Sequence, residues 1–281
     1  MKILIVGHVC IDRNVTESGK FIGAGSPAMF MHKIFSQLPE TDTHIIATYG
    51  KDFLPFKGAA QLYPAESGNS NTLVYENTMT GNGRIQKCFY HEEALPPPIT
   101  SQLQELVRNA DCICFAPLTP VFSVEYVYRL VSLKQHQAKV FLLPQGYFRQ
   151  FDKAGLVTVR EFTEAPALLP YIDAVIVSDQ DHSDMYTLAH EWAKTSGTTV
   201  IMTRAEKGAM IITTDREEVV PTTPVDKNEI VSSIGAGDIF SAGFMYEFQR
   251  SGDALKAAQI GNSLARQGLF FTPDTLQITL P

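Results

Sequence analysis

The chain has 281 residues, of which 44% are hydrophobic and 19% are charged. That composition is typical of a globular protein with one large or two small domains, and it excludes a wholly disordered or fibrous chain. The formal net charge of −7 disfavours duplex nucleic acid and anionic membranes as main partners, because both reward a basic protein face.

The first part of the chain begins with an alternation of strand and helix patterns. Lys2–Val6 is a continuous apolar run that ends at Gly7, which is typical of a strand buried on both faces of a parallel sheet. A helix-length apolar pattern and a further strand follow at Pro27–Leu38 and His44–Thr48. Strand formers at Thr72–Glu76 and Ile85–Tyr90 flank the turn sequence Thr80-Gly-Asn-Gly-Arg84, which predicts a β-hairpin. We expect this hairpin to project from the main body.

After Pro96-Pro-Pro98, strand and helix patterns alternate towards the end of the chain. The expected helices are Ser101–Asn109, Ser123–Gln135, Ser183–Thr195, Ile239–Arg250 and Asp253–Gln267. The expected strands are Cys112–Phe115, Lys139–Leu143, Ala174–Val177 and Thr199–Thr203, with a late hairpin from Ala209–Thr213 and Glu218–Val220. This alternation predicts an α/β fold with a mainly parallel sheet and helices on both faces. We find no repeat or linker, so residues 1–281 are interpreted as one domain.

Cysteine usage and the N-terminus indicate the compartment. The four cysteines, Cys10, Cys88, Cys112 and Cys114, are too few for a disulfide framework in a chain of this length. Neither they nor the seven histidines show metal-ligand spacing. The chain starts directly with a strand pattern, without a signal-peptide arrangement or a membrane-length apolar run. We therefore expect a cytoplasmic protein without a membrane partner.

Polar residues follow several of the predicted strands. They are Asp12, Gln145, Ser178, Asp179, Asp181 and Thr203. In open parallel sheets, ligands bind beyond the carboxyl ends of the strands. The pattern therefore predicts a ligand site at that edge of the sheet.

The segment Gly235-Ala236-Gly237 precedes a helical pattern that starts near Asp238. Glycines at this place let backbone N–H groups approach an anion, with the positive end of the helix dipole behind them. A carboxylate beside a bound phosphate can accept the proton of an attacking hydroxyl group. The same residues also suit a simple helix cap, and the segment lacks the Gly-Lys-Ser/Thr ending of a Walker P-loop.

At these residues the sequence resembles the ribokinase-like family of carbohydrate kinases, also called the PfkB family. Gly235-Ala-Gly-Asp238 followed by Ile-Phe-Ser-Ala-Gly243 is similar to the C-terminal signature of that family. The resemblance implies that Gly235, Ala236 and Gly237 form an anion hole and that Asp238 is the catalytic base. It also implies a three-layer ribokinase-like sandwich, with a β-hairpin lid around residues 13–22 and 71–92.

Further motifs extend the resemblance to the acceptor side. Gly7-His-Val-Cys-Ile-Asp12 and Gly23-Ala-Gly-Ser-Pro-Ala28 are similar to the substrate loops of the family. Gln145-Gly-Tyr-Phe-Arg149 resembles a stretch of its inositol-kinase branch, although Arg149 also suits pairing with a surface carboxylate. Substrate binding is implied for Asp12, Gly23, Gly25, Gln145, Arg149 and the lid residue Arg84.

Motifs on the donor side are similar to those that surround the nucleotide in the family. They are Thr203-Arg-Ala-Glu-Lys-Gly208, Gly261-Asn262 and Ser178-Asp-Gln-Asp181. The resemblance implies nucleotide contacts for Thr203, Gly208, Asn262 and Ser178, and a metal role for Asp181. It implies ATP and Mg²⁺ as co-reactants, and it is compatible with a monovalent cation such as K⁺ and with a homodimer.

The sequence departs from the family pattern at several positions. Ala24 and Ala205 replace glycines, Met29 replaces an asparagine, and Asp181 replaces a glutamate. We expect an ATP-dependent kinase that phosphorylates a hydroxyl of a sugar or an inositol. A nucleoside kinase of the same family and a non-catalytic polyol- or nucleotide-binding regulatory protein remain alternatives. The intact Asp238 favours catalysis, because a pure binding protein needs no base there.

Overall fold

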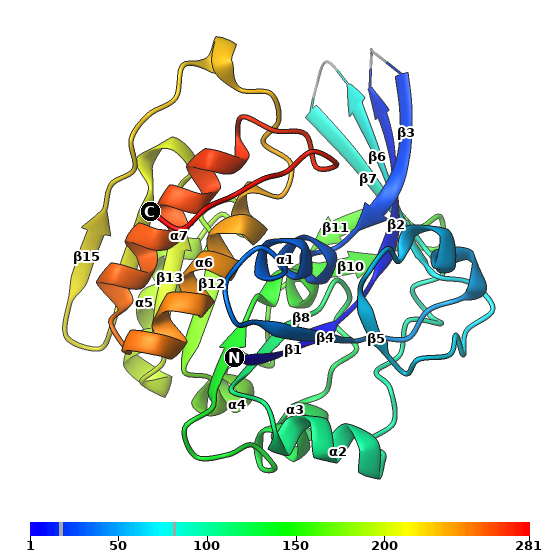
Figure 1. Cartoon of the computed structure of the whole chain (residues 1–281), viewed down its shortest axis with the longest axis horizontal. Coiled ribbons are helices and arrows are strands. Elements are labelled where there is room, and N and C mark those ends of the chain that lie inside the picture. The colour runs from blue at the N-terminus through cyan, green and yellow to red at the C-terminus, as the bar shows by residue number, and fades with distance from the viewer. Residues whose placement is uncertain (17–18, 81–82) are drawn as a thin grey trace.

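A nine-stranded, mostly parallel sheet forms the centre of the computed structural model, which describes residues 1–16, 19–80 and 83–281 (Figure 1). From one edge to the other its strands are β15 (Glu217–Val220), β14 (Ala209–Ile212), β13 (Thr199–Thr203), β12 (Ala174–Ser178), β9 (Lys139–Leu142), β8 (Cys112–Ala116), β1 (Lys2–Gly7), β4 (Asp42–Ile46) and β5 (Gln61–Tyr63). In this spatial order, the strands from β13 through β5 are parallel to one another, whereas β14 and β15 form the predicted late hairpin. The carboxyl ends of the parallel strands therefore share one edge.

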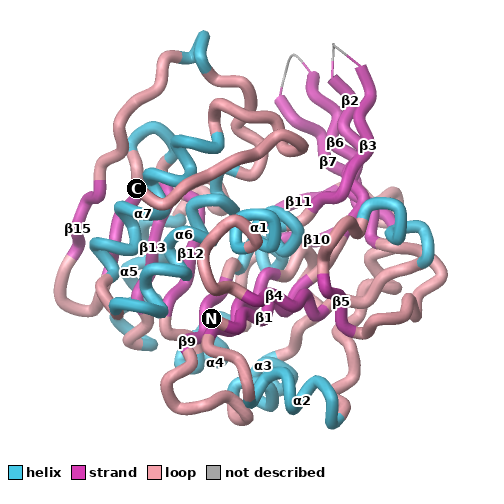
Figure 2. Tube along the Cα trace, viewed as in Figure 1, coloured by secondary structure: helices cyan, strands magenta, loops and turns pink. Residues whose placement is uncertain are grey.

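Helices cover both faces of this sheet, which gives three layers (Figure 2). One face packs against α1 (Pro27–Phe35), α6 (Ala236–Ser251) and α7 (Ala254–Gly268). The other packs against α2 (Ser101–Arg108), α3 (Val124–Val131), α4 (Ala165–Leu168) and α5 (Met185–Ser196). Because side chains alternate along a strand, Ile3 and Ile5 enter the first layer and Leu4 and Val6 enter the second. The predicted three-layer α/β architecture with a mainly parallel sheet is confirmed.

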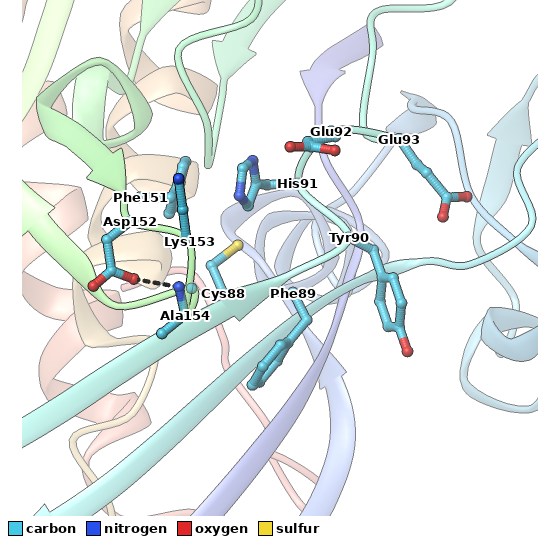
Figure 3. Close-up of a pocket in the computed structure, with 11 residues that line it drawn as sticks. Cys88, Phe89, Tyr90, His91, Glu92, Glu93, Phe151, Asp152, Lys153 and Ala154 are labelled. Atoms are coloured by element: carbon cyan, nitrogen blue, oxygen red, sulfur yellow. Dashed lines mark hydrogen bonds between the residues drawn. The ribbon is translucent and has the colours of Figure 1, made fainter.

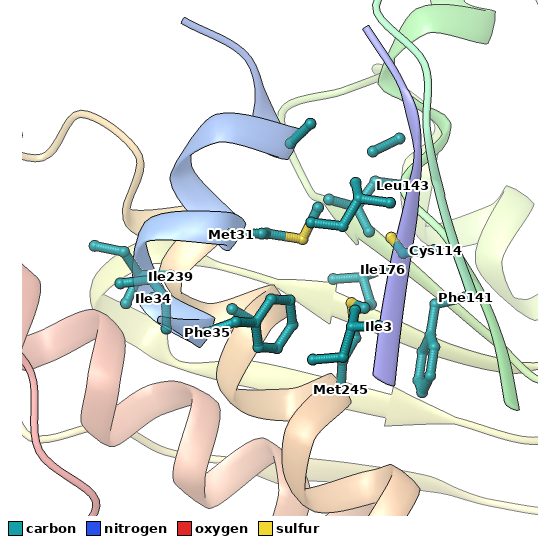
Figure 4. Packing of buried hydrophobic residues seen from close by; sticks show 14 of the residues in the cluster. Ile3, Met31, Ile34, Phe35, Cys114, Phe141, Leu143, Ile176, Ile239 and Met245 are labelled. Carbon is teal, nitrogen blue, oxygen red and sulfur yellow. The ribbon is translucent and has the colours of Figure 1, made fainter. Parts of the chain in front are cut away.

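Buried apolar side chains fill the core between α1, α6 and the sheet. Met31 and Phe35 of α1 pack with Ile3 of β1 and Met245 of α6 (Figure 4). This packing fixes α1 and α6 against the sheet. It thereby holds the N-terminus of α6 at the carboxyl edge of the strands.

A second sheet of four strands projects from the main body (Figure 1). Its order is β3 (Gly19–Gly25), β2 (Cys10–Thr16), β6 (Leu73–Thr80) and β7 (Gly83–Phe89). Strands β6 and β7 form the predicted hairpin, whereas β2 pairs in parallel with β6 from far along the chain. We call these four strands the small sheet. A separate antiparallel pair, β10 (Arg149–Phe151) and β11 (Val157–Val159), lies beside its base.

Some predicted boundaries differ from the structure. Helix α1 ends at Phe35 rather than Leu38, and α3 ends at Val131 rather than Gln135. Beyond each end the chain tightens into turns in which the N–H groups of Gln37 and Leu133 donate to the carbonyls three residues back. Helix α6 starts at Ala236, before the predicted Ile239. The short 3₁₀ helices were not expected; they are η1 (Lys51–Phe56), η2 (Pro144–Phe148), η3 (Leu169–Tyr171), η4 (Ala205–Lys207) and η5 (Lys227–Glu229).

Two further observations concern the helices and the cysteines. Among the described residues, no helix combines the length and the apolar character that crossing a membrane requires. Cys10, Cys88, Cys112 and Cys114 are buried free thiols. Cys112 and Cys114 lie in the same layer of the core, as expected for residues two apart in a strand.

Ala205 adopts a left-handed backbone conformation, with φ of 48°. This explains why glycine is usual here in the family that the sequence resembles, because a side chain is strained in that region. We expect Ala205→Gly to raise the free energy of unfolding by about 0.5–1 kcal/mol, measured by urea denaturation. Glu206→Gly, at a residue outside the left-handed region, is the control and is expected to lower it. If Ala205→Gly is also destabilising, strain at Ala205 is not the reason.

Candidate active site

Four charged residues meet at the carboxyl edge of the main sheet. Asp12 lies on β2, which follows β1, and Arg149 begins β10 after β9 and η2. Asp181 follows β12, and Asp238 lies in the first turn of α6. The charges of Asp12, Asp181 and Arg149 all act on the Asp238 carboxyl. The structure therefore brings together residues that the sequence places more than 200 positions apart.

Asp238 carries a carboxyl that is poised to exchange a proton near neutral pH. Burial raises its pKa to about 7, and the charges of Asp12 and Asp181 add to the rise, while Arg149 opposes it. The carboxylate accepts no hydrogen bond from the described residues, and the N-cap position Gly235 has no side-chain cap either. The Asp238 carboxylate therefore does not act as a helix cap within the described structure. A partnerless carboxyl with a pKa near the working pH suits a general base.

The N-terminus of α6 presents open backbone N–H groups beside Asp238. Gly235 has φ of 79°, and a Cβ there would lie 2.5 Å from the ring of Phe30, so only glycine fits. Ala236 N–H donates to the carbonyl of Ser233 at 3.2 Å, whereas the N–H groups of Gly237 and Asp238 meet no acceptor among the described residues. A Cβ on Gly237 would meet nothing within 4 Å. These open donors at a helix N-terminus suit an anion.

The Gly-rich loop leaves room for the Asp12 carboxylate. A Cβ on Gly25 would lie 2.3 Å from Oδ2 of Asp12, so the absence of a side chain is what lets the carboxylate sit there. Gly23, which pairs with Asp12 across β2 and β3, faces open space. The thiol of Cys10 donates to Oδ1 of Asp12 at 3.3 Å. Asp12 is therefore positioned by its own strand and by the neighbouring β3.

Arg149 is a buried cation with few partners. Its exposed fraction is 9%, and its guanidinium lies 4.8 Å from the centre of the Tyr75 ring on β6. Within the described protein, the guanidinium makes one hydrogen bond, from Nη1 to the carbonyl of Leu118 at 3.5 Å. Pairing with a surface carboxylate, the alternative open at the sequence level, is wrong because the side chain is buried. Gln145, on η2, is half-buried, and its amide makes no hydrogen bond to the described protein.

Sequence reasoning missed His8, which supports Arg149 from behind. Its Nδ1 accepts the N–H of Leu118 at 2.9 Å, and its Nε2 lies 3.0 Å from the carbonyl of Ala94. The Tyr75 hydroxyl and Arg149 both donate to the Leu118 carbonyl. Burial lowers the pKa of His8 to about 4, so the ring is neutral with its proton on Nε2. Only its place directly after β1 hinted at this role.

Asp181 is the candidate metal ligand. Its Oδ2 accepts the N–H of Ser178 at 2.8 Å, and burial raises its pKa. Within the described part of the chain, no three His, Cys, Asp or Glu residues are placed to hold a metal ion together. Mg²⁺ usually takes one or two carboxylates and completes its shell with phosphate oxygens and water. The residues present therefore fit a phosphate-bound Mg²⁺.

Two of the predicted nucleotide residues, Asn262 and Gly208, pack against the loop after β15. Both Asn262 contacts run from its Nδ2 to the carbonyls of Val220 and Pro221, at 3.0 and 3.3 Å. A Cβ on Gly208 would lie 2.2 Å from the Val220 carbonyl oxygen. Thr203 donates to the carbonyl of Val177 at 3.1 Å. Their nucleotide contacts stay predictions, and the Asn262 amide nitrogen is already engaged.

Two features lie outside this group. The side chain of Arg84 is outside the described part, so its substrate role stays a prediction. A separate hollow of about 600 Å³ lies between residues 88–93 and 151–155 (Figure 3). His91 stacks on Phe151 there, with ring centres 4.5 Å apart. None of the predicted site residues lines this hollow.

The pKa of Asp238 predicts the pH dependence of catalysis. The base must be deprotonated, so kcat/KM should fall below a pH of about 7 and level off above it. Asp12→Asn removes a charge that raises this pKa, so the acid limb should move to lower pH while KM rises. Initial rates between pH 5 and 9 check this, with exposed Asp215→Asn as the control. An unmoved limb in Asp12→Asn would contradict the assignment.

The chain is similar to several known kinases. The model of the pfkB family carbohydrate kinase matches residues 67–268. A cytidine kinase from Thermococcus kodakarensis is 22% identical over 296 residues, which cover 96% of each chain. A deoxyribokinase from Salmonella typhimurium is 29% identical over 131 residues, covering 46% of this chain and 41% of its own.

Solved structures with this fold include several kinases. A pyrophosphate-dependent kinase of the ribokinase family, in complex with a pyrophosphate analogue and myo-inositol, has a TM-score of 0.75 at 16% identity, covering 96% of this chain and 95% of its own. A nucleoside kinase from Methanocaldococcus jannaschii has a TM-score of 0.67 at 17% identity, covering 95% and 91%. At these identities the likeness concerns the fold.

Proposed function

This chain belongs to the pfkB family of carbohydrate kinases and is a phosphotransferase that acts on hydroxyl groups, and from that premise we propose that it transfers the γ-phosphoryl group of ATP to a neutral sugar or inositol. The observation that carries the proposal is the Asp238 carboxyl, which has no partner among the described residues and whose pKa is raised to about 7, beside the open N–H groups of α6. A base and an anion site in one turn of helix are the two parts that such a transfer needs.

The residues divide the chemistry between them. A substrate hydroxyl lies at Asp238 and attacks the γ-phosphorus, while the bond from that phosphorus to the leaving ADP oxygen breaks. The hydroxyl proton passes to the Asp238 carboxylate as the new P–O bond forms. The N–H groups of Gly237 and Asp238 stabilise the charge on the moving phosphoryl group. Asp12 and Arg149 bind and orient the remaining hydroxyls.

The donor side is assigned more coarsely. ATP is the donor that family membership implies. Asp181 would hold Mg²⁺ together with the phosphates, and the ion would neutralise donor charge. Asn262 and Gly208 position the loop after β15, which we place at the nucleotide. A requirement for K⁺ and a homodimer remain expectations from the resemblance.

The small sheet is proposed to act as a lid over the acceptor. Its strand β2 carries Asp12, and its strand β6 carries Tyr75, on which Arg149 stacks. Closure over the substrate would exclude the water that otherwise hydrolyses ATP. The proposal therefore makes the lid part of acceptor binding.

Nucleosides are the second candidate class of acceptor. The relative that matches over 96% of both chains acts on cytidine by its name, whereas a neighbour in fold was solved with myo-inositol. A non-catalytic binding protein is disfavoured, because a buried carboxyl with a raised pKa and no partner within the described part of the chain lowers stability, and a binding protein needs no base there.

A donor and acceptor screen tests the proposal. Purified protein is incubated with Mg²⁺ and either ATP or pyrophosphate, and with myo-inositol, ribose, deoxyribose, cytidine or adenosine, with and without K⁺. We expect ADP and a phosphomonoester to form with one of the sugars or inositol. Product with a nucleoside alone would favour the second class. Tight acceptor binding in calorimetry without product would favour the binding protein.

A further inference from the structure

A row of side-chain amides crosses the small sheet. Asn14 on β2 is in register with Asn77 on β6, and Asn77 is in register with Gln86 on β7. Nε2 of Gln86 donates to Oδ1 of Asn77 at 2.7 Å, and Nδ2 of Asn77 donates to Oδ1 of Asn14 at 3.0 Å. We call these three residues the amide row. All three are half-buried.

The amide row lies on the face of the small sheet that carries Asp12. Asp12 and Tyr75 are paired in register, and each lies two residues before a member of the amide row. Residues two apart in a strand share a face and are separated by about 7 Å. Tyr75 on this face meets Arg149, and Asp12 acts on Asp238. The amide row therefore lies two residues farther along the strands than Asp12 and Tyr75, on the same face.

The row is an unusual choice for a strand position. Asparagine is depleted in strands, and three adjacent amides replace the β-branched and aromatic pairs that stabilise sheets best. Such local departures from the rules of stability are expected at functional sites. The inter-amide bonds leave Nδ2 of Asn14 and Oε1 of Gln86 without a partner among the described residues. A donor and an acceptor thus remain open at opposite ends of the row.

An aromatic side chain lies beyond the Asn14 end of the amide row. Phe21 on β3 is directly opposite Asn14 and is 56% exposed. Residues directly opposite in an antiparallel pair lie on the same face. The surface thus combines an exposed phenyl ring with uncharged groups that donate and accept hydrogen bonds.

Resting on the proposed function, we infer that Asn14, Asn77 and Gln86 form a subsite for the part of the acceptor that is remote from the phosphorylated hydroxyl. The chemistry it fits is a neutral ring edge that both donates and accepts hydrogen bonds, with an apolar face towards Phe21. Vicinal hydroxyls of a cyclic polyol and the edge of a nucleobase share this chemistry. An anionic end, such as a second phosphate, does not fit, because the row adds no positive charge and Asp12 lies next to it.

Asn77→Ala tests the subsite, because Asn77 is the centre of the row. With the best acceptor from the screen, we expect KM and the calorimetric Kd to rise about five- to tenfold, as for a lost hydrogen bond, while kcat changes less than threefold. Thr78→Ala is the matched control, since the next residue of β6 points to the opposite face. It should leave KM unchanged.

A double-mutant-type cycle identifies the group that is bound. It combines Asn77→Ala with an acceptor that lacks one hydroxyl, or with a nucleoside whose base edge is altered. If the amide row contacts that group, the rise in KM caused by removing the group and by Asn77→Ala together should be smaller than the product of the two separate rises. The inference would be overturned if Asn77→Ala lowers the melting temperature but leaves KM and Kd unchanged, or if the two effects in the cycle simply multiply. The row would then only stabilise the sheet. The dependence of wild-type turnover on Asp238 is measured separately. The proposed function can therefore hold even if the subsite is wrong. If wild-type protein neither binds nor phosphorylates any acceptor, both are overturned.

Discussion

Asp238→Asn is expected to lower kcat by about 10²–10⁴-fold, the usual contribution of a positioned general base. The amide keeps the size and the place of the side chain but cannot accept the proton of the substrate hydroxyl. Because the carboxyl makes no hydrogen bond to the described protein, the fold should tolerate the change. The remaining activity should also lose its acid limb near pH 7, since the titrating group is gone. Steady-state rates with the best acceptor, across pH, measure both effects.

Asp253→Asn is the matched control, since Asp253 also stands at the start of a helix. Its carboxylate caps α7 by accepting the N–H groups of Leu255 and Lys256. We expect a loss of about 1 kcal/mol in stability or less and unchanged kcat. If Asp238→Asn loses less than tenfold, which is about 1.4 kcal/mol, the base assignment is wrong.

Arg149→Met is expected to lower kcat/KM by about 10–100-fold, as for the loss of a charged hydrogen bond to the substrate. Methionine replaces the buried stem but not the guanidinium, so the stack on Tyr75 and the bond to Leu118 are lost as well. The charge of Arg149 opposes the rise in the pKa of Asp238. Its removal should therefore move the acid limb of the pH profile above pH 7, opposite to the shift from Asp12→Asn.

Two further variants separate these effects. Arg149→Lys keeps the charge without the planar fork, so the acid limb should return towards pH 7 while kcat/KM stays lowered. Arg160→Met removes an arginine that pairs with Glu164 at the surface and should change neither quantity. An unmoved limb and an unchanged kcat/KM in Arg149→Met would place Arg149 outside the site.

The main sheet could be predicted from the sequence because its strands are short apolar runs. Cys112–Ala116 and Ala174–Ser178 are buried on both faces and carry few polar residues, so pattern alone identifies them. Strands β2 and β3 were harder, because Gly19–Gly25 holds three glycines, a composition that disfavours strands. Strand β3 pairs with β2, and β2 in turn pairs with β6, which lies about 60 residues away. Local patterns contain no information on such a pairing.

The site divides in the same way. Asp238 follows from its motif, because the glycines and backbone N–H groups beside it are adjacent in the chain. Asp12 follows from its place shortly after the first strand, although the room that Gly25 leaves for it does not. The burial of Arg149 depends on Tyr75 and Leu118, and the support of Leu118 depends on His8. These contacts join four distant segments. Phe30 beneath Gly235 is likewise a meeting of α1 and α6 that no spacing predicts.

The transfer of ³²P from the γ-position of ATP to a neutral acceptor, compared between wild type and Asp238→Asn, tests the central claim most directly. The account predicts a labelled phosphomonoester of a sugar or inositol with the wild type and Mg²⁺, and at least about a hundredfold less with Asp238→Asn. Equal labelling by both proteins, or no labelled acceptor from wild type that binds the acceptor, would contradict it.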